Sequence, residues 1–168
     1  IIALEHELYQ QLRNDIKLVI KDVQETARAL AELDVLCSLA LVGYEENYIC
    51  PTIVMNGQIN IRDGRHPVIE KFLKREVFVP NDIVLNHDDE EFLLITGPNM
   101  AGKSTYMRQA AILMIMAQIG SFIPAREASI SPVDRIFTRV GASDDISTGQ
   151  STFMVEMKEV AYILENAT

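Results

Sequence analysis

The ten residues TGPNMAGKST, at positions 96–105, constrain the fold of this chain more than any other stretch. They stand between the apolar run at 92–95 and a helical pattern that starts at Ser104. The stretch fits G-x-x-x-x-G-K-[ST] without a mismatch, and its glycines let the backbone wrap around an anion and aim N–H donors inward. The helix that follows turns its positive dipole end toward the same point. The spacing therefore predicts a strand, a phosphate-binding loop and a helix.

Two side chains of this loop have distinct expected roles. The Lys103 ammonium is expected to reach the β and γ phosphates of a nucleotide, and the Ser104 hydroxyl is expected to ligate Mg²⁺. The other interpretation is a glycine-rich turn that joins a strand to a helix and leaves Lys103 in solvent. The residues expected to bind the nucleotide here are Gly97, Pro98, Asn99, Met100, Ala101, Gly102, Lys103, Ser104 and Thr105.

One long helix is expected to precede this region. Residues 1–42 contain neither Gly nor Pro, and Gly43 is a typical helix stop. At 1.5 Å per residue, about 42 residues span roughly 60 Å, which is longer than a small domain is wide. We therefore divide the chain into a connector helix at 1–43, either a packing arm or a lever that carries motion, and a domain at 44–168. Apolar residues recur in steps of three and four, at Leu4, Leu8, Leu12, Ile16, Val19, Val23, Ala27 and Leu30.

Extended runs and helical patterns alternate in the rest of the chain. This alternation predicts an α/β domain with helices packed on a largely parallel sheet. The expected helices are 104–120, with Gly120 as its stop, and a last helix from 151–152 onward. The expected strands are 58–64, 75–82, 90–96, 121–125 and 134–140. The last helix is expected to turn inward Phe153, Met157, Val160, Ala161 and Leu164.

Composition and charge exclude several classes of protein. The net charge of −9 has the wrong sign for a surface that binds nucleic acid backbones through counterion release. No apolar run approaches the roughly 20 residues of a membrane span. Cys37 and Cys50 are expected to be buried or idle thiols of a reducing compartment, because no zinc-type spacing surrounds them. The N-terminus has neither Met nor a signal peptide, so we expect the chain to start inside a longer one.

Four motifs together resemble the ATPase region of the MutS family of DNA mismatch repair. They are GRHPVIE at 64–70, TGPNMAGKSTYMRQAA at 96–111, DRIFTRVGASDD at 134–145 and STFMVEM at 151–157. The resemblance covers essentially the entire chain, since 1–42 is similar to the end of that family's lever helices. It implies an α/β fold, a P-loop NTPase of ABC type, with 44–168 as the N-terminal part of the ATPase domain. In that type, each nucleotide lies between one subunit's P-loop and the partner's signature loop.

The resemblance also implies roles for Asn99 and Ser151. Asn99 matches the position near the γ-phosphate or the attacking water, and it joins Lys103 as a catalytic candidate. Ser151 matches the signature serine, which acts in trans on the partner's nucleotide. The alternative for Asn99 is a turn residue after Pro98, and for Ser151 it is a plain N-cap, which is compatible with the role in trans.

The resemblance further implies a base-binding segment before the loop. Phe78 matches the aromatic residue that stacks on the adenine ring, and Val79 and Asn81 match the lining of the base pocket. Without the resemblance, Phe78 is an ordinary strand aromatic that packs at a sheet edge.

One motif of the family is missing from these residues. MutS proteins carry an apolar strand that ends in Asp-Glu, where the Asp supports Mg²⁺ and the Glu polarises the attacking water. No such run occurs before Thr168. The fold is therefore expected to be incomplete, with ATPase activity in the intact protein and none from this chain alone.

The implied function is ATP binding and hydrolysis coupled to conformational switching of a mismatch-bound dimer. The implied cofactors are ATP or ADP and Mg²⁺. The implied partners are a second MutS-type subunit, mismatched DNA held by domains absent here, and downstream mismatch-repair proteins, with no membrane. The implied location is the cytoplasm, at the nucleoid if the protein is bacterial. Two alternatives stay open: a dimerisation or interaction fragment without turnover, and an unrelated P-loop kinase.

Overall fold

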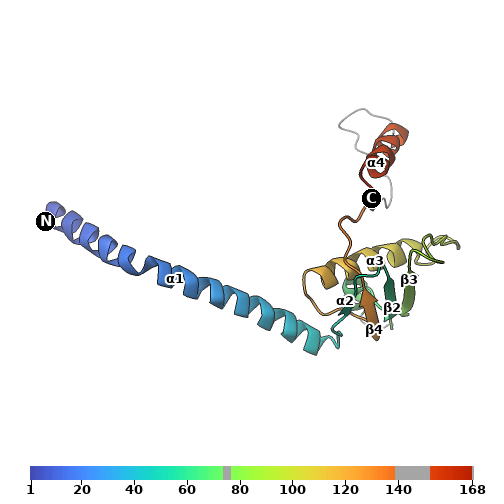
Figure 1. The fold of residues 1–168 in the computed structure, drawn as a ribbon, viewed down its shortest axis with the longest axis horizontal. Helices are drawn as coiled ribbons and strands as arrows, with labels where there is room; N and C mark the ends of the chain where they lie inside the picture. Colours follow the sequence, from blue (N-terminus) through green and yellow to red (C-terminus); the bar gives the residue numbers. More distant parts are fainter. Residues whose placement is uncertain (74–76, 139–151, 168) are drawn as a thin grey trace. The chain divides into compact units, whose positions relative to one another are not determined.

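The computed structural model describes residues 1–73, 77–138 and 152–167, and the chain divides into two compact units, Ile1–Glu45 and Glu46–Thr168 (Figure 1). Among the described residues, no helix combines the length and the apolar character that crossing a membrane requires. The first unit is the helix α1, Ile2–Glu45. The second unit contains the strands β1 (Thr52–Ile53), β2 (Ile59–Gly64), β3 (Asn81–Leu85) and β4 (Glu127–Ile130) and the helices α2 (Pro67–Phe72), α3 (Lys103–Gln118) and α4 (Thr152–Asn166).

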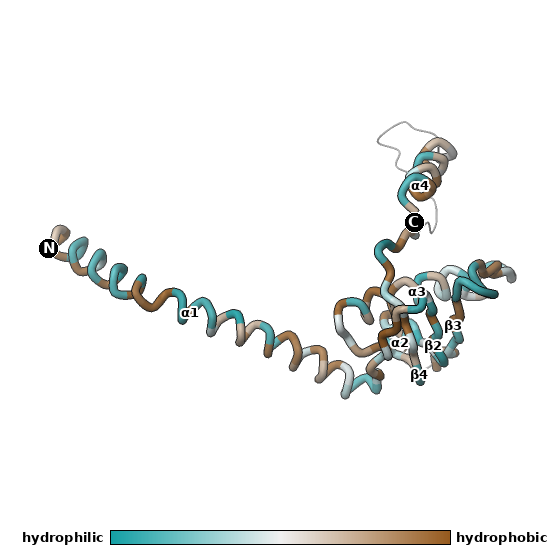
Figure 2. Tube along the Cα trace, viewed as in Figure 1, coloured by the Kyte–Doolittle hydropathy of each residue, from teal (hydrophilic) through white to brown (hydrophobic). Residues whose placement is uncertain are grey.

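Helix α1 confirms the long helix expected from the periodicity. Apolar residues recur along its whole length (Figure 2), and those of the repeating face, such as Leu12 and Leu30, are exposed. Its end differs from the expectation, because Gly43 lies inside the helix and the chain leaves it only after Glu45. Asn47, with φ of 54°, supplies the left-handed residue that Gly43 was expected to supply. Asn tolerates this conformation better than other side chains, so it is the next most frequent helix stop after Gly.

The sheet is mixed, with the strand order β1-β4-β2-β3. Strand β2 pairs antiparallel with both β3 and β4, and only β1 with β4 is parallel. The expected largely parallel sheet is therefore wrong. The physical reason is visible in β2, where the buried Ile61 alternates with the half-exposed Asn60 and Arg62. A sheet with one apolar and one polar face is typical of antiparallel pairing, whereas parallel strands are buried on both faces.

The core lies between the sheet and one face of α3. Spacing predicts this helix at 104–120, and the structure confirms it, with Gly120 at φ of 81° just beyond its end. The core consists of Ile61, Ile83, Leu113, Met114, Ala117, Ile123, Ala125 and Ile130.

Both cysteines, Cys37 and Cys50, are free and exposed.

Four of the five expected strands differ from the structure, and only 58–64 matches closely, as β2. Strand β3 begins after Pro80 rather than before it, since Pro has no N–H to donate to a ladder. The 121–125 run contributes only a single bridge, between Ile123 and Ile49. In 134–140, residues 134–138 form no strand and the last two lie outside the described residues. Strand β4, by contrast, lies in a stretch where no strand was expected.

The apolar run at 92–95 was expected to be a buried strand, and this expectation is also wrong. It forms no strand, and Phe92 and Leu94 are 82% and 79% exposed. Leu93 and Ile95, 40% and 36% exposed, face a cavity of about 370 Å³ beside α3. The side chains therefore alternate as in a strand, but no strand in the described part of the chain pairs with this segment.

Helix α4 begins at Thr152, as expected, but its apolar face is not buried. Met157, Val160 and Leu164 are 44%, 38% and 76% exposed, and the Phe153 side chain is not among those described. Apolar side chains turn inward only where another element covers them. Among the contacts of α4 with 135–138, the Nη1 of Arg135 donates to the Asn166 carbonyl oxygen and Oδ1, and the Phe137 ring packs edge-on against Tyr162.

Helix α2 was not expected, because six residues are too few for a periodic pattern. Its N-cap is His66, whose Nδ1 accepts from the Ile69 N–H at 3.4 Å, and Pro67 follows at the first helical position. Pro is favoured there because its missing N–H would have no helical partner. His66 is buried, and this burial lowers the pKa of the imidazole.

Candidate nucleotide-binding site

The loop at 97–102 is shaped by three residues with positive φ. Gly97 has φ of 152°, Met100 of 65° and Gly102 of 89°. Gly102 is also the N-cap of α3 and makes no side-chain cap bond, so the N-cap residue leaves the first N–H groups of the helix without a side-chain partner. A β-carbon at Gly102 would meet nothing within 4 Å, and one at Gly97 would meet only Ala101 at 3.9 Å. The loop therefore leaves room for a group of anion size at a helix N-terminus.

The Lys103 side chain folds back over this loop. Its Nζ donates to the carbonyl oxygens of Gly97 at 2.8 Å and of Pro98 at 2.6 Å. The ammonium group is thus held beside the loop by backbone oxygens instead of extending into solvent. This position suits a cation that meets an anion seated in the loop.

A cavity of about 490 Å³ joins the loop to the segment before β3. It brings together residues that are more than 20 positions apart in the sequence. It is lined by the expected base-binding residues Phe78, Val79 and Asn81 together with Ala101, Gly102, Lys103 and Thr105. Ile95, Thr96 and Tyr106 complete the lining.

The remaining expected site residues either belong to the loop and the start of α3 or fall outside the described residues. Pro98, Asn99 and Met100 form the exposed outer part of the loop. Ser104 is exposed in the first turn of α3. Ser151 lies outside the described residues. In the described part of the chain, no group of three or more His, Cys, Asp or Glu side chains is arranged to hold a metal ion.

Tyr106 is a lining residue that the sequence reasoning missed. Its ring packs against the core, and its hydroxyl donates to the carbonyl oxygen of Asp82 at 2.8 Å. Burial, followed by the nearby charge of Asp82, raises the pKa of this phenol. The feature of the sequence that could have indicated Tyr106 is its place in the first turn of the helix, on the face that packs against the sheet.

The part of the cavity wall formed by Phe78, Val79 and Asn81 contains a hydrogen bond of its own. The Asn81 Nδ2 donates to the Val79 carbonyl oxygen at 3.0 Å, and Asn81 pairs with Gly64 across the sheet. The wall is therefore attached to the first residues of β3.

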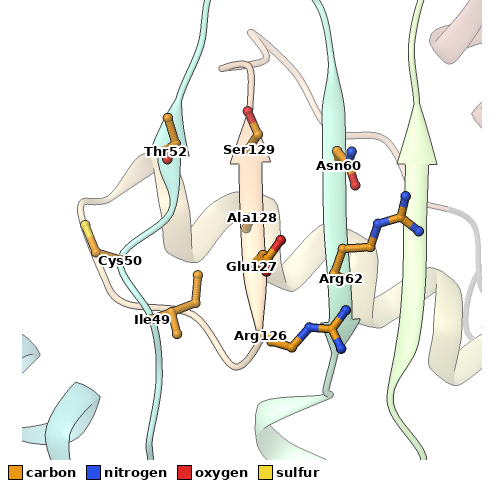
Figure 3. Close-up of a pocket in the computed structure, with 9 residues that line it drawn as sticks. All are labelled: Ile49, Cys50, Thr52, Asn60, Arg62, Arg126, Glu127, Ala128 and Ser129. Carbon is orange, nitrogen blue, oxygen red and sulfur yellow. The ribbon is translucent and has the colours of Figure 1, made fainter.

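A second cavity of about 440 Å³ lies on the sheet face turned away from α3 (Figure 3). It contains two arginines, but each is already paired: Arg62 with Asp82 at 2.7 Å, and Arg126 with Asp63 at 2.8 Å. Glu127 adds a third carboxylate. Three carboxylates for two guanidinium groups disfavour a phosphate, so the cavity beside the P-loop is the better nucleotide site.

The comparisons with known proteins agree on one family. A family model described as MutS domain V matches residues 93–168. The chain is 57% identical to the DNA mismatch repair protein MutS of Acetivibrio thermocellus over 168 residues, which is 100% of this chain and 19% of that protein. It is 59% identical over 166 residues to the protein of the same name from Syntrophomonas wolfei, covering 99% of this chain and 19% of that one.

A third relative extends this agreement. The DNA mismatch repair protein MutS of Caldicellulosiruptor bescii is 55% identical over 168 residues, which is 100% of this chain and 20% of that protein. The chain thus spans about a fifth of the length of the curated relatives it matches. Identity above one half across essentially every residue leaves no other assignment: this chain belongs to the MutS family.

Proposed function

We propose that this chain is the ATP-binding portion of a MutS-type DNA mismatch repair ATPase of the P-loop, ABC type. The observation that carries the proposal is the cavity that joins the G-x-x-x-x-G-K-S loop to the segment containing Phe78. Its two ends suit the two ends of a nucleotide. The names of the relatives support the biological role, and the activity of the whole protein is part of the proposal.

The phosphates of ATP or ADP would lie in the loop. The N–H groups at the start of α3, which have no partner within the helix, and the helix dipole favour negative charge there. Lys103 adds a full positive charge, exchanging its bonds with the Gly97 and Pro98 carbonyls for bonds to phosphate oxygens. The positive φ angles at positions 97 and 102 favour glycine, which has no β-carbon to enter this space.

The base would lie at the other end of the same cavity. The ring of Phe78 offers a stacking surface for adenine, and Val79 and Asn81 line the pocket beside it. The bond from Asn81 to the Val79 carbonyl holds this wall in shape before a ligand arrives.

Two polar side chains would assist the phosphate chemistry. The Ser104 hydroxyl is an oxygen ligand of the type Mg²⁺ prefers, at the start of α3 where the phosphates would lie. When bound, Mg²⁺ offsets the charge of the phosphate oxygens. The amide of Asn99 both donates and accepts, so it can orient a water molecule next to those oxygens.

The whole protein would act as a dimer on DNA. Ser151 would contact the nucleotide of a second MutS-type subunit, and α1 would be the end of a lever that transmits the nucleotide state. Mismatched DNA would be bound by domains absent here, and downstream mismatch-repair proteins would respond to the switch. We place this activity in the cytoplasm, at the nucleoid in a bacterium.

Nucleotide binding tests the proposal directly. We expect Mg²⁺-dependent binding of ATP and ADP by the 168-residue chain in calorimetric titration, and its loss in Lys103→Ala, because the phosphates lose their full positive charge. Lys17→Ala, on α1, is the matched control and should bind as the wild type does. Equal affinity in Lys103→Ala and wild type would remove the phosphate-loop assignment.

A further inference from the structure

The Tyr106 side chain links the helix behind the phosphate loop to the strand that follows Phe78. Tyr106 lies in the first turn of α3, directly after the phosphate loop, and its ring is fixed against the core. Its hydroxyl donates to the Asp82 carbonyl oxygen at 2.8 Å. Asp82 is the second residue of β3, immediately after the wall that contains Phe78 and Asn81. The helix that carries the loop is thus bonded to the strand that carries the wall.

Asp82 is itself held from the other side. Its Oδ1 accepts from the Asp63 N–H at 2.9 Å, and its Oδ2 accepts from the Arg62 Nη1 at 2.7 Å. The Asp63 amide first, and then Arg62, lower the pKa of the Asp82 carboxyl group. Asp63 has φ of 49° and lies in the irregular pairing between Ile61 and Gly64. The strand irregularity therefore presents an N–H to Asp82 that a regular ladder would not.

Helix α3 also packs closely against the sheet at Gly64, next to Asp63. A β-carbon on Gly64 would lie 2.9 Å from the Gln109 Nε2 and 3.2 Å from the Asn81 carbonyl oxygen. Gly64 thus permits a close approach of α3, β2 and β3 beneath the wall. Packing this tight transmits a shift of the helix to the wall and leaves little slack between them.

We infer that Tyr106 is a positioning residue that sets the distance between the phosphate loop and the base wall; this rests on the proposed function. The affinity of a ligand that occupies both the loop and the base wall depends on that distance. The affinity of a ligand that occupies only the loop does not. Tyr106 therefore contributes to the preference for a nucleoside triphosphate over a bare polyphosphate.

The test compares Mg²⁺-ATP with inorganic triphosphate as probes for the wild type, Tyr106→Phe and Tyr9→Phe. Tyr106→Phe removes only the hydroxyl, so we expect about 5-fold weaker ATP binding, as for loss of one neutral hydrogen bond. Triphosphate affinity should change by less than about 2-fold, because the loop keeps its shape. Tyr9, exposed on α1, is the matched control, and its variant should bind both probes normally.

A second variant acts on the other side of the link. Asp82→Ala removes the bonds to Asp63 and Arg62 and should weaken ATP binding in the same selective way. The loss of ATP affinity in the double variant should be smaller than the product of the two single-variant losses, because both changes loosen the attachment of β3 at Asp82. A thermal unfolding scan of each variant verifies that it is folded before its affinity is compared.

Three outcomes would overturn the inference. If Tyr106→Phe weakened ATP and triphosphate binding equally, the tyrosine would support the loop itself and not the spacing. If it weakened neither, the hydroxyl would position nothing. If the wild type bound neither probe, the proposed function would fail first, and this inference would fail with it.

Discussion

Helices α1 and α3 both carry apolar residues at helical spacing, and they expose them very differently. On α1, Leu12 and Leu30 are 59% and 60% exposed, whereas on α3 Leu113 is fully buried. The pattern of α1 is the more regular of the two, so amphipathicity does not explain the difference. Helix α3 is covered by the sheet, which presents Ile61 and Ile83 to it. Periodicity thus indicates which face favours burial, and a distant partner determines whether that face is buried.

The largest effect expected from this comparison is on stability. Leu113→Ala should lower the free energy of unfolding by about 2–5 kcal/mol, since it removes a buried side chain and leaves a cavity. Leu12→Ala should change it by less than about 1 kcal/mol, because the side chain is half in solvent and Ala is a good helix former. Urea unfolding followed by tyrosine fluorescence measures both. Similar losses in the two variants would contradict the assignment of the core to the sheet and α3.

The stops of the two helices allow a finer comparison. Helix α3 is followed by Gly120 at φ of 81°, and a β-carbon there would meet nothing within 4 Å, so Gly120→Ala tests backbone conformation alone. It should destabilise the chain by about 1–2 kcal/mol. Asn47→Gly, after α1, should stabilise it by up to about 1 kcal/mol, since Asn47 already has φ of 54°. Thermal unfolding of both variants measures these changes, and a destabilised Asn47→Gly would contradict the left-handed stop.

The smallest expected effect is a pH dependence confined to the second unit. Folding lowers the pKa of His66. Below about pH 6.5 its imidazole is therefore protonated more readily in the unfolded chain than in the folded chain. Stability should therefore fall as the pH drops from about 7.5 to about 5.5. His66→Asn keeps an acceptor at the N-cap and should flatten this dependence, whereas His6→Asn, on α1, should not. Urea midpoints at several pH values measure the slopes, and an unchanged slope in His66→Asn would exclude this histidine as the cause.

Local features of the fold were predictable from the sequence, and non-local pairing was not. The absence of Gly and Pro in 1–42 predicts α1, and the helix expected from Ser104 begins one residue earlier, at Lys103. Strand β4, with the sequence EASI, has no apolar run that would reveal it. It forms because it pairs with β1 on one side and β2 on the other. The residues of these two strands stand about 70 positions earlier in the sequence.

In the candidate site, too, the local feature was predictable from the sequence and the non-local contacts were not. Spacing alone identifies the loop from Gly97 to Ser104. The expectation for Phe78 comes from the family resemblance, because nothing local relates a residue before Pro80 to a loop about 20 positions later. The hydrogen bond of Tyr106 could not have been predicted from either source, since its partner is a backbone oxygen of Asp82. A carbonyl group has the same chemistry in every residue, so a sequence does not mark which one will accept a bond.

The extended segment at 92–95 has a practical consequence for handling the chain. Four consecutive apolar residues whose backbone pairs with no strand in the described part of the chain can add to the sheet edge of another molecule and begin aggregation. Directly before them stand Asp88, Asp89, Glu90 and Glu91, whose like charges keep such segments apart. Because salt screens this repulsion and acid removes it, concentrated stocks should stay clear longest in dilute buffer near neutral pH.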